Sequence, residues 1–228
     1  PTNFVLRVTN NLTIGPNGVL GVCDVRCGGN LQLSGGGKLN VYALPTNSTT
    51  RPGNGALVAV TNSMTVGASS WVYAWSDSYS GGSPLFRMQD LTVNTGGGFD
   101  ATATGYRGNR GKGAGGSGER IRGAGYGGRG GAGQFGGTGG LTYGFTNAPL
   151  QPGSGGAVTA AGEGGYGGGF IRVEAAGTVT LNGSLIANGG TSLGYTTYPS
   201  GGSGGGVFVR CRNFSGDANG AFQARGGV

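Results

Sequence analysis

The sequence of 228 residues contains no histidine, and only 10% of its residues are charged. Without histidine, the chain can form neither a Ser–His–Asp triad nor a histidine-liganded metal site. Proline is scarce, with 8 residues, and glycine does not recur at every third position, which excludes collagen. No apolar run approaches the roughly 20 residues of a membrane-spanning helix.

The few acidic side chains give no indication of an enzyme. The chain holds 8 Asp and Glu residues, and no two of them lie close together in the sequence. Glycan hydrolysis needs a pair of carboxylates, and calcium-binding β-helix repeats need Gly-Gly-x-Gly-x-Asp units, which do not occur. We therefore expect no enzymatic activity, no metal and no cofactor.

Cysteine is also rare, and its odd number leaves either an unpaired thiol or an intermolecular bridge: Cys23, Cys27 and Cys211. In an extended strand, Cys23 and Cys27 would lie about 13 Å apart, so a disulfide between them needs a turn. The Gly28-Gly29 pair is a candidate for that turn. The pairing within this candidate disulfide set stays open.

Composition also indicates where the protein is located. Lysine is scarce, charge is low, and Ser, Thr, Asn and Gly are abundant, which predicts an extracellular or cell-surface protein. The chain opens at Pro1 without a methionine and stops within a repeat at Val228. This pattern is typical of a mature product or of an excised segment of a longer polypeptide.

Positive charge is concentrated in one part of the chain, whose net charge is +7. Between Gly105 and Gly130, a single acid, Glu119, accompanies six basic residues: Arg107, Arg110, Lys112, Arg120, Arg122 and Arg129. They form either a solvated loop or a patch for surface glycans and other polyanions. Only two Arg-Gly-Gly triplets occur, so we do not expect nucleic acid as a partner.

What the sequence does contain is a repeat. A short apolar motif recurs in six copies: Leu12-Thr-Ile14, Leu31-Gln-Leu33, Met64-Thr-Val66, Leu91-Thr-Val93, Val179-Thr-Leu181 and Phe214-Ser-Gly216. Neighbouring copies lie 19 to 35 residues apart, except the fourth and fifth, which a long insertion separates. Each copy is followed by a Gly/Asn-rich turn and an alternating strand. Such a unit buries too few side chains to fold alone, whereas stacked units bury a continuous column. The sequence therefore predicts an all-β parallel β-helix, with a β-sandwich as the alternative.

A glycine-rich segment interrupts the repeats. It contains the densest clusters of the chain's 58 glycines. Residues 1–104 carry four repeats, residues 105–169 form this insertion, and residues 170–228 carry two more, all within one continuous structural unit. The insertion is a flexible linker, a nucleic-acid-binding tract, or an ordered set of extended, polyproline-II-like strands. We favour the ordered form, which is similar to glycine-rich regions of some receptor ectodomains and antifreeze proteins.

The later repeats carry a family resemblance. They begin with Gly-Gly-Phe170-Ile-Arg-Val and Gly-Gly-Val207-Phe-Val-Arg and end with Leu185-Ile-Ala-Asn-Gly-Gly and Phe222-Gln-Ala-Arg-Gly-Gly. This unit resembles the glycine-rich β-strand repeats of bacterial surface and secreted proteins, including autotransporter-passenger and adhesin β-helices. The resemblance implies an extracellular right-handed β-helix with an adhesive or scaffold role, and it supplies no catalytic motif.

Three functions are compatible with these features. The first is head-to-tail self-assembly into a fibre, sheath or surface layer, because open strand edges can pair with another copy. The candidate edge residues are Val5, Leu6 and Val8 at one end, and Phe222, Ala224 and Val228 at the other.

The second candidate function is glycan binding by an adhesin module. Trp71, Tyr73 and Trp75 alternate along one strand and share a face, which forms either an aromatic platform or part of the core. The third is ice binding by outward threonines at repeated positions, namely Thr13, Thr65, Thr92 and Thr180.

Overall fold

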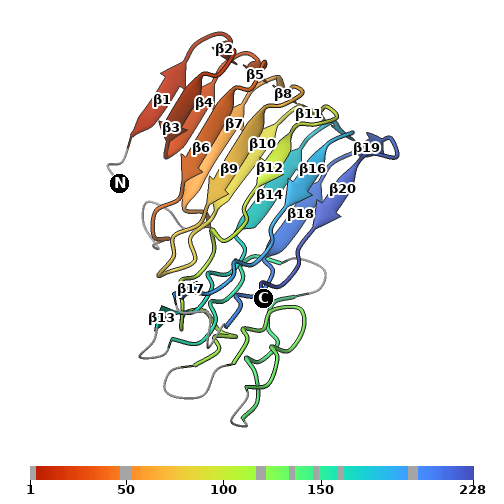
Figure 1. The fold of residues 1–228 in the computed structure, drawn as a ribbon. Helices are drawn as coiled ribbons and strands as arrows, with labels where there is room; N and C mark the ends of the chain where they lie inside the picture. The colour runs from red at the N-terminus through yellow and green to blue at the C-terminus, as the bar shows by residue number, and fades with distance from the viewer. Residues whose placement is uncertain are drawn as a thin grey trace.

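The computed structural model describes residues 4–46, 53–116, 122–133, 137–145, 149–158, 162–194 and 200–228. Within these ranges there is no helix, and three parallel sheets of six strands each make up most of the regular structure. The described residues thus include no helix long and apolar enough to cross a membrane. Successive strands belong to successive sheets, so the chain winds as a parallel β-helix (Figure 1). The predicted fold is confirmed, and the β-sandwich alternative is wrong.

Each sheet takes every third strand of the winding. Sheet A contains β1 (Val5–Val8), β4 (Asp24–Cys27), β7 (Ala56–Val60), β10 (Pro84–Met88), β14 (Phe170–Ala175) and β18 (Gly206–Arg210). Sheet B contains β2 (Leu12–Ile14), β5 (Leu31–Leu33), β8 (Ser63–Val66), β11 (Asp90–Val93), β15 (Thr178–Leu181) and β19 (Asn213–Gly216). Sheet C contains β3 (Val19–Val22), β6 (Lys38–Tyr42), β9 (Trp71–Trp75), β12 (Gly98–Asp100), β16 (Ser184–Ile186) and β20 (Ala221–Gln223).

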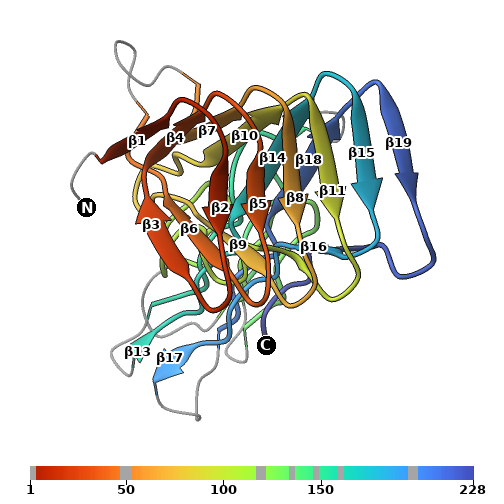
Figure 2. The same cartoon turned by 90° about the horizontal axis from the view of Figure 1, so that it is seen from above.

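One strand from each sheet makes a rung, and six rungs follow one another along the axis (Figure 2). Rung 1 is β1–β3 and rung 6 is β18–β20. The insertion leaves the β-helix after β12 in rung 4, and the chain returns at β14 in rung 5. Because β12 pairs directly with β16, the insertion does not interrupt the stacking of rungs.

The alternation of apolar and polar side chains places the core inside the winding. In β6, Leu39 and Val41 are fully buried while Lys38 and Tyr42 are exposed. The sheet B repeat motif supplies one buried column, because Leu31, Met64 and Leu91 lie in register in successive rungs.

The corners between sheets B and C explain why Gly and Asn recur after each motif. The third residue of the corner is left-handed in rungs 1 to 4, at Asn17, Gly36, Ser69 and Gly96, with φ between 55° and 85°. Gly and Asn adopt this conformation at low cost, as predicted. Ser69 adopts it too, and its amide is held by the carbonyl of Gly96 at 3.1 Å.

The glycine-rich segments form a second ordered part, here called the glycine bundle. It comprises residues 105–116, 122–131, 139–144, 153–158, 164–169, 187–190, 200–205 and 224–227, which lie beyond one end of the sheets' strands (Figure 1). A two-stranded antiparallel pair, β13 (Gly162–Glu163) and β17 (Leu193–Gly194), lies on the same side. The bundle therefore extends past residues 105–169 and includes the segments that follow β16 and β20.

Main-chain hydrogen bonds in the bundle follow a three-residue period. The amides of Gly165 and Gly168 both donate to one neighbouring segment, at Ser200 (2.7 Å) and Ser203 (2.9 Å). Between them, the amide of Gly167 donates to a different segment, at Tyr106 (2.8 Å). Polyproline II has three residues per turn, so each third amide points the same way. The expectation of ordered glycine strands is confirmed for the described segments.

Close approach of main chains explains why these positions are glycine. A Cβ atom at Gly167 would lie 1.9 Å from the carbonyl oxygen of Gly153, and one at Gly205 would lie 1.9 Å from that of Gly169. Tyr126 packs at the side of the bundle, where its hydroxyl donates a hydrogen bond to the carbonyl of Gln151 at 2.9 Å. Burial raises the pKa of this hydroxyl to about 12. Any side chain at the crowded glycines must push two segments apart.

Gly167→Ala tests this packing. We expect the variant to lose about 3 kcal/mol or more of unfolding free energy, because the methyl group and the Gly153 carbonyl cannot occupy the same place. The matched control is Gly131→Ala, where a Cβ atom would meet nothing within 4 Å. Urea denaturation of both variants provides the measurement. Equal stabilities for the two would show that the bundle is not closely packed.

Candidate functional site

The two end rungs expose side chains that other rungs bury. Phe214 and Phe222 occupy core-facing positions of β19 and β20, yet they are 53% and 52% exposed, and their ring centroids lie 6.0 Å apart. At the other end, Leu6, Leu12 and Leu20 pack against the core but are only partly buried. No described strand pairs with the outer edges of these two rungs.

The end rungs belong to the same columns of the β-helix. In-register pairing across all six rungs connects Leu6 with Val209, Leu12 with Phe214, and Leu20 with Phe222. Each column thus begins with a leucine and ends with an apolar side chain. The two rungs present matching apolar positions on opposite ends of the axis.

The corner between sheets B and C also has the same length in both end rungs, whereas three residues join β1 to β2 and two join β18 to β19. Four residues join β2 to β3, and four join β19 to β20. Each corner is closed by one hydrogen bond, from Gly18 to Gly15 at 3.0 Å and from Gly220 to Asp217 at 3.1 Å. A rung placed against either end could therefore follow the same path at the corner between sheets B and C.

The predicted edge residues lie in these rungs, with different orientations. Leu6 and Val8 face the core, and Val5 faces outward with 36% exposure. Phe222 faces the open end, while Val228 is 84% exposed and follows the last segment of the glycine bundle. Ala224, also exposed, directly follows β20.

The aromatic residues of β9 lie on the outer face of sheet C. Val72 and Ala74 point into the core and are fully buried, so Trp71, Tyr73 and Trp75 face outward. Inward packing, the other interpretation of their spacing, is therefore wrong. Tyr42 of the preceding rung joins them: its ring stacks on that of Trp75 at 5.8 Å, with 25° between the planes.

Glycines lie beside two of the aromatic rings, and a Cβ atom at Gly98 would be too close to the ring of Trp71. A Cβ atom at Gly98 would lie 2.7 Å from Cζ3 of Trp71, and one at Gly21 would lie 3.5 Å from Cε2 of Tyr42. Polar groups surround the rings, since Asn40 and Asp100 pair in register with Tyr73 on either side. We call Tyr42, Trp71, Tyr73 and Trp75 the aromatic platform.

The predicted threonine ladder lies on the outer face of sheet B. Thr65, Thr92 and Thr180 occupy neighbouring strands in register, and the Oγ1 of Thr180 is 3.0 Å from the Oγ of Ser215 in rung 6. Thr13 belongs to the same column, but Gln32 stands between it and Thr65. The ladder is thus continuous over three rungs and interrupted in rung 2.

All three cysteines are thiols in the structure, so the predicted disulfide does not occur there. The extended strand β4 separates Cys23 from Cys27 by about 13 Å, and four strand spacings put Cys211 about 19 Å from β4. A disulfide needs Cα atoms within about 7 Å. The single thiol proton of Cys27 instead has two main-chain carbonyl acceptors within reach of Sγ, Asn10 at 3.2 Å and Asn30 at 3.3 Å.

Part of the predicted basic segment gathers around one tyrosine. The guanidinium carbons of Arg107 and Arg110 each lie 5.2 Å from the ring centroid of Tyr79. Arg107 also hydrogen-bonds Glu163 and Tyr79, and these bonds raise the pKa of its guanidinium.

The remaining basic residues differ in exposure. Lys112 and Arg129 are exposed, Arg122 is half-buried, and Arg120 lies outside the described residues.

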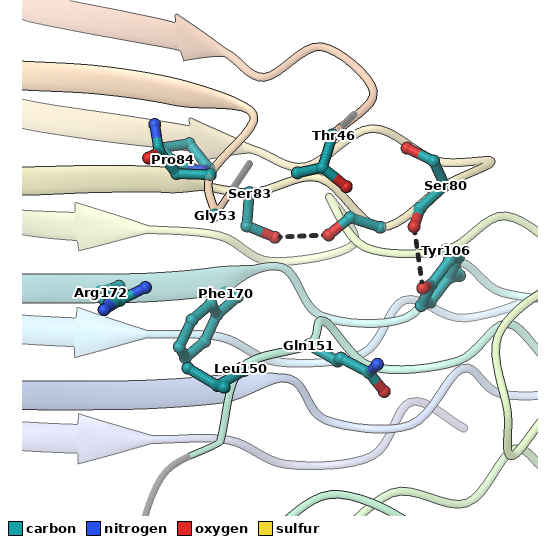
Figure 3. A pocket seen from close by; sticks show the side chains of 12 residues that line it. Thr46, Gly53, Ser80, Ser83, Pro84, Tyr106, Leu150, Gln151, Phe170 and Arg172 are labelled. Carbon is teal, nitrogen blue, oxygen red and sulfur yellow. Dashed lines mark hydrogen bonds between the residues drawn. The ribbon is translucent and has the colours of Figure 1, made fainter. Parts of the chain in front are cut away.

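A cavity of about 210 Å³ lies between the β-helix and the glycine bundle (Figure 3). Its lining residues come from six separate stretches of chain: Thr46, Gly53, Asn54, Ser80, Gly81, Ser83, Pro84, Tyr106, Leu150, Gln151, Phe170 and Arg172. The hydroxyl of Tyr106 donates to the carbonyl of Ser80 at 3.2 Å, and that of Ser83 donates to Gly81 at 3.1 Å. The cavity has room for a small polar molecule.

One acid on the outer face of sheet A is surrounded by arginines. The carboxylate of Glu174 accepts hydrogen bonds from Arg87 (2.8 Å) and Arg172 (2.6 Å), and Arg210 lies 3.4 Å away. Burial alone would raise the pKa of Glu174, but the arginines outweigh it and the pKa lies below its ordinary value. The Nε of Arg172 is buried and has no hydrogen-bond partner.

The comparisons with known proteins add no functional assignment. No protein-family model, no curated protein and no solved structure matches the chain. Function is therefore inferred from the surfaces described above.

Sequence reasoning missed three features of these surfaces. Phe214 was placed in the last repeat copy but was not named among the candidate edge residues, although its side chain is exposed in the end rung. Tyr42 joins the platform only because β6 and β9 pair in register. The arginines around Glu174 come from three strands, and Arg87 is 87 residues away from the acid, so no local motif reveals the cluster.

Replacing Glu174 with Gln is expected to lower the free energy of unfolding by about 1–3 kcal/mol, because the arginines lose a charged acceptor. The stabilisation by Glu174 is fully present above its ordinary pKa of 4.5 and is lost as the pH falls through the lower folded-state pKa. Urea denaturation between about pH 6 and pH 3 should therefore show a smaller loss of stability for the variant than for the wild type. Parallel pH profiles would contradict this assignment.

Proposed function

We propose that the protein is an extracellular structural protein whose copies stack head to tail into a filament, sheath or surface layer. The observation that carries this proposal is the match between rung 1 and rung 6. Their core-facing positions lie in the same columns, and their sheet B to sheet C corners have the same length. The glycine-rich repeats, which resemble those of bacterial surface proteins, agree with this location and role.

The physical gain on stacking comes from two sources. Parallel strand addition pairs main-chain groups that otherwise face water at the outer edges of the end rungs. It also covers the exposed rings of Phe214 and Phe222, and burying a large apolar side chain contributes about 1.5–3 kcal/mol. Because opposite ends meet, the contact repeats without closing and builds a filament.

Two end-blocked variants test the stacking. Phe222→Asp places a charge at the open face of rung 6, and Leu20→Asp does so at rung 1. We expect the wild type to form filaments in electron micrographs as its concentration rises, and each variant alone to stay monomeric. An equimolar mixture should form dimers, because each variant keeps one intact end.

The matched control is Phe145→Asp, which places the same charge at an aromatic residue that is 77% exposed and lies outside the end rungs. It should assemble as the wild type does, and circular dichroism should show β-structure in all variants. A wild-type protein that stays monomeric at every concentration, or a Phe222→Asp variant that still forms filaments, would overturn the proposal.

The aromatic platform favours glycan binding as a second candidate function. Aromatic rings offer apolar area to the faces of sugar rings, and the outer face of sheet C carries the stacked pair Tyr42 and Trp75. Tyr73 lies on the same face, with Asn40 and Asp100 as polar neighbours in register. Trp75 is 39% exposed and Tyr42 is 38% exposed, so both rings are accessible.

Fluorescence offers a direct measurement, because both tryptophans of the chain, Trp71 and Trp75, belong to the platform. A bound oligosaccharide should change their emission, and Trp75→Ala should weaken binding about tenfold or more, or about 1.4 kcal/mol. Phe145→Ala is the control with an exposed aromatic removed elsewhere. A glycan array on which Trp75→Ala and the wild type bind equally would exclude the platform as the binding site.

A further inference from the structure

A column of arginines runs along the outer face of sheet A. In-register pairing of the six strands places the following residues one above another: Arg7, Arg26, Ala59, Arg87, Glu174 and Arg210. With strands about 4.8 Å apart, the column spans about 24 Å. These residues are distant in sequence and lie outside the basic segment at residues 105–130, so only the register of the sheet brings them together.

The column carries more positive charge than its own acid can neutralise. Glu174 forms ion pairs with Arg87 and Arg210 within the column and with Arg172 beside it. Arg7 and Arg26 lie directly opposite each other with no carboxylate between them, and like charges in this position destabilise a sheet. Such a pair is more favourable when an external anion covers it.

The neighbouring acid on this face does not remove the excess. Asp24 lies two residues before Arg26 in β4, and its Oδ1 accepts the main-chain amide of Leu57 at 2.8 Å. Five arginines on the outer face of sheet A, including Arg172, thus face two acids, Asp24 and Glu174. The side chains of Arg87 and Arg210 are 57% and 70% exposed, and Arg7 and Arg26 are exposed as well.

We propose that this outer face of sheet A binds a linear acidic polysaccharide that lies along the β-helix axis. Arginine forks pair with planar carboxylates through two parallel hydrogen bonds. A uronic acid polymer carries one carboxylate per sugar, and one sugar unit is close in length to one rung. Arg7 and Arg26 then take carboxylates of adjacent sugars, and Arg87 takes a third two rungs further on.

Nucleic acid fits the face less well. Duplex DNA carries one charge per about 1.7 Å of its axis, which is denser than one arginine per rung. Single strands are held largely by stacking of bases on aromatic rings. Of the two aromatic residues on the outward positions of sheet A, Phe170 is buried, so only Phe208 is accessible for stacking. A polymer with one charge per rung-length unit is the better match.

The column also bears on the proposed stacking. Arg210 and Arg7 occupy the same column at opposite ends, so a head-to-tail junction places them in adjacent rungs, next to Arg26. This step rests on the proposed function. A polyanion that crosses the junction would screen three successive arginines and favour longer stacks.

Binding is tested on the end-blocked Phe222→Asp variant, so that failure of the stacking proposal does not affect the result. Polygalacturonate is the probe, and its fully methyl-esterified form is the uncharged control. In this background, Arg7→Gln/Arg26→Gln should weaken binding about tenfold or more at low salt, and the salt dependence should become shallower. Arg110→Gln/Arg129→Gln removes the same charge from the glycine bundle and should leave the affinity within about twofold of the parent.

Glu174→Gln gives a test of opposite sign. It removes the carboxylate that competes for Arg87 and Arg210, so polygalacturonate should bind more tightly, although the variant is less stable. The proposal is overturned if the bundle double variant weakens binding as much as Arg7→Gln/Arg26→Gln does. It is also overturned if the esterified polymer binds equally well, or if single-stranded DNA of the same length binds more tightly than polygalacturonate.

Discussion

Main-chain hydrogen bonding between segments that lie side by side is the interaction on which both parts of this protein depend. In the β-helix, each strand bonds to the same strand of the rungs before and after it. In the glycine bundle, successive amides of one segment bond to different neighbours, as Gly165 and Gly167 do. The two parts differ in the space that lies between neighbouring main chains. In the sheets, every side chain has room on one of the two faces, whereas in the bundle almost no position has room for a side chain.

This difference explains which features the sequence could predict. The β-helix was predictable because Leu-x-Leu alternation and the turn residues after it recur in every rung. For the glycine insertion, the sequence could predict that ordered extended strands form but not which strands lie side by side. Glycine has no side chain whose size or polarity would indicate the neighbouring segment. That Gly165 meets Ser200, and that residues 224–227 join the bundle, follows from the three-dimensional path of the chain.

A candidate surface could be predicted from the sequence where all its residues belong to one strand, but not where they come from several strands. Trp71, Tyr73 and Trp75 share a strand, and the small residues Val72 and Ala74 between them decide which side faces the core. The stacking of Tyr42 on Trp75 and the arginines around Glu174 depend on register between rungs. Register in turn depends on the corner lengths, which vary along the chain. No disulfide joins Cys23 to Cys27 for a related reason, since β4 stays extended between them.

The proposed head-to-tail contact joins unlike ends of the β-helix, and such a contact sets no size for the assembly. A contact between unlike ends leaves every growing stack with the same two ends as a single copy, so no number of copies is favoured by geometry. The dimensions of such an object would be decided by how fast subunits are supplied and how firmly the last one is held. The fold would specify the width of the assembly and leave its length to the surroundings.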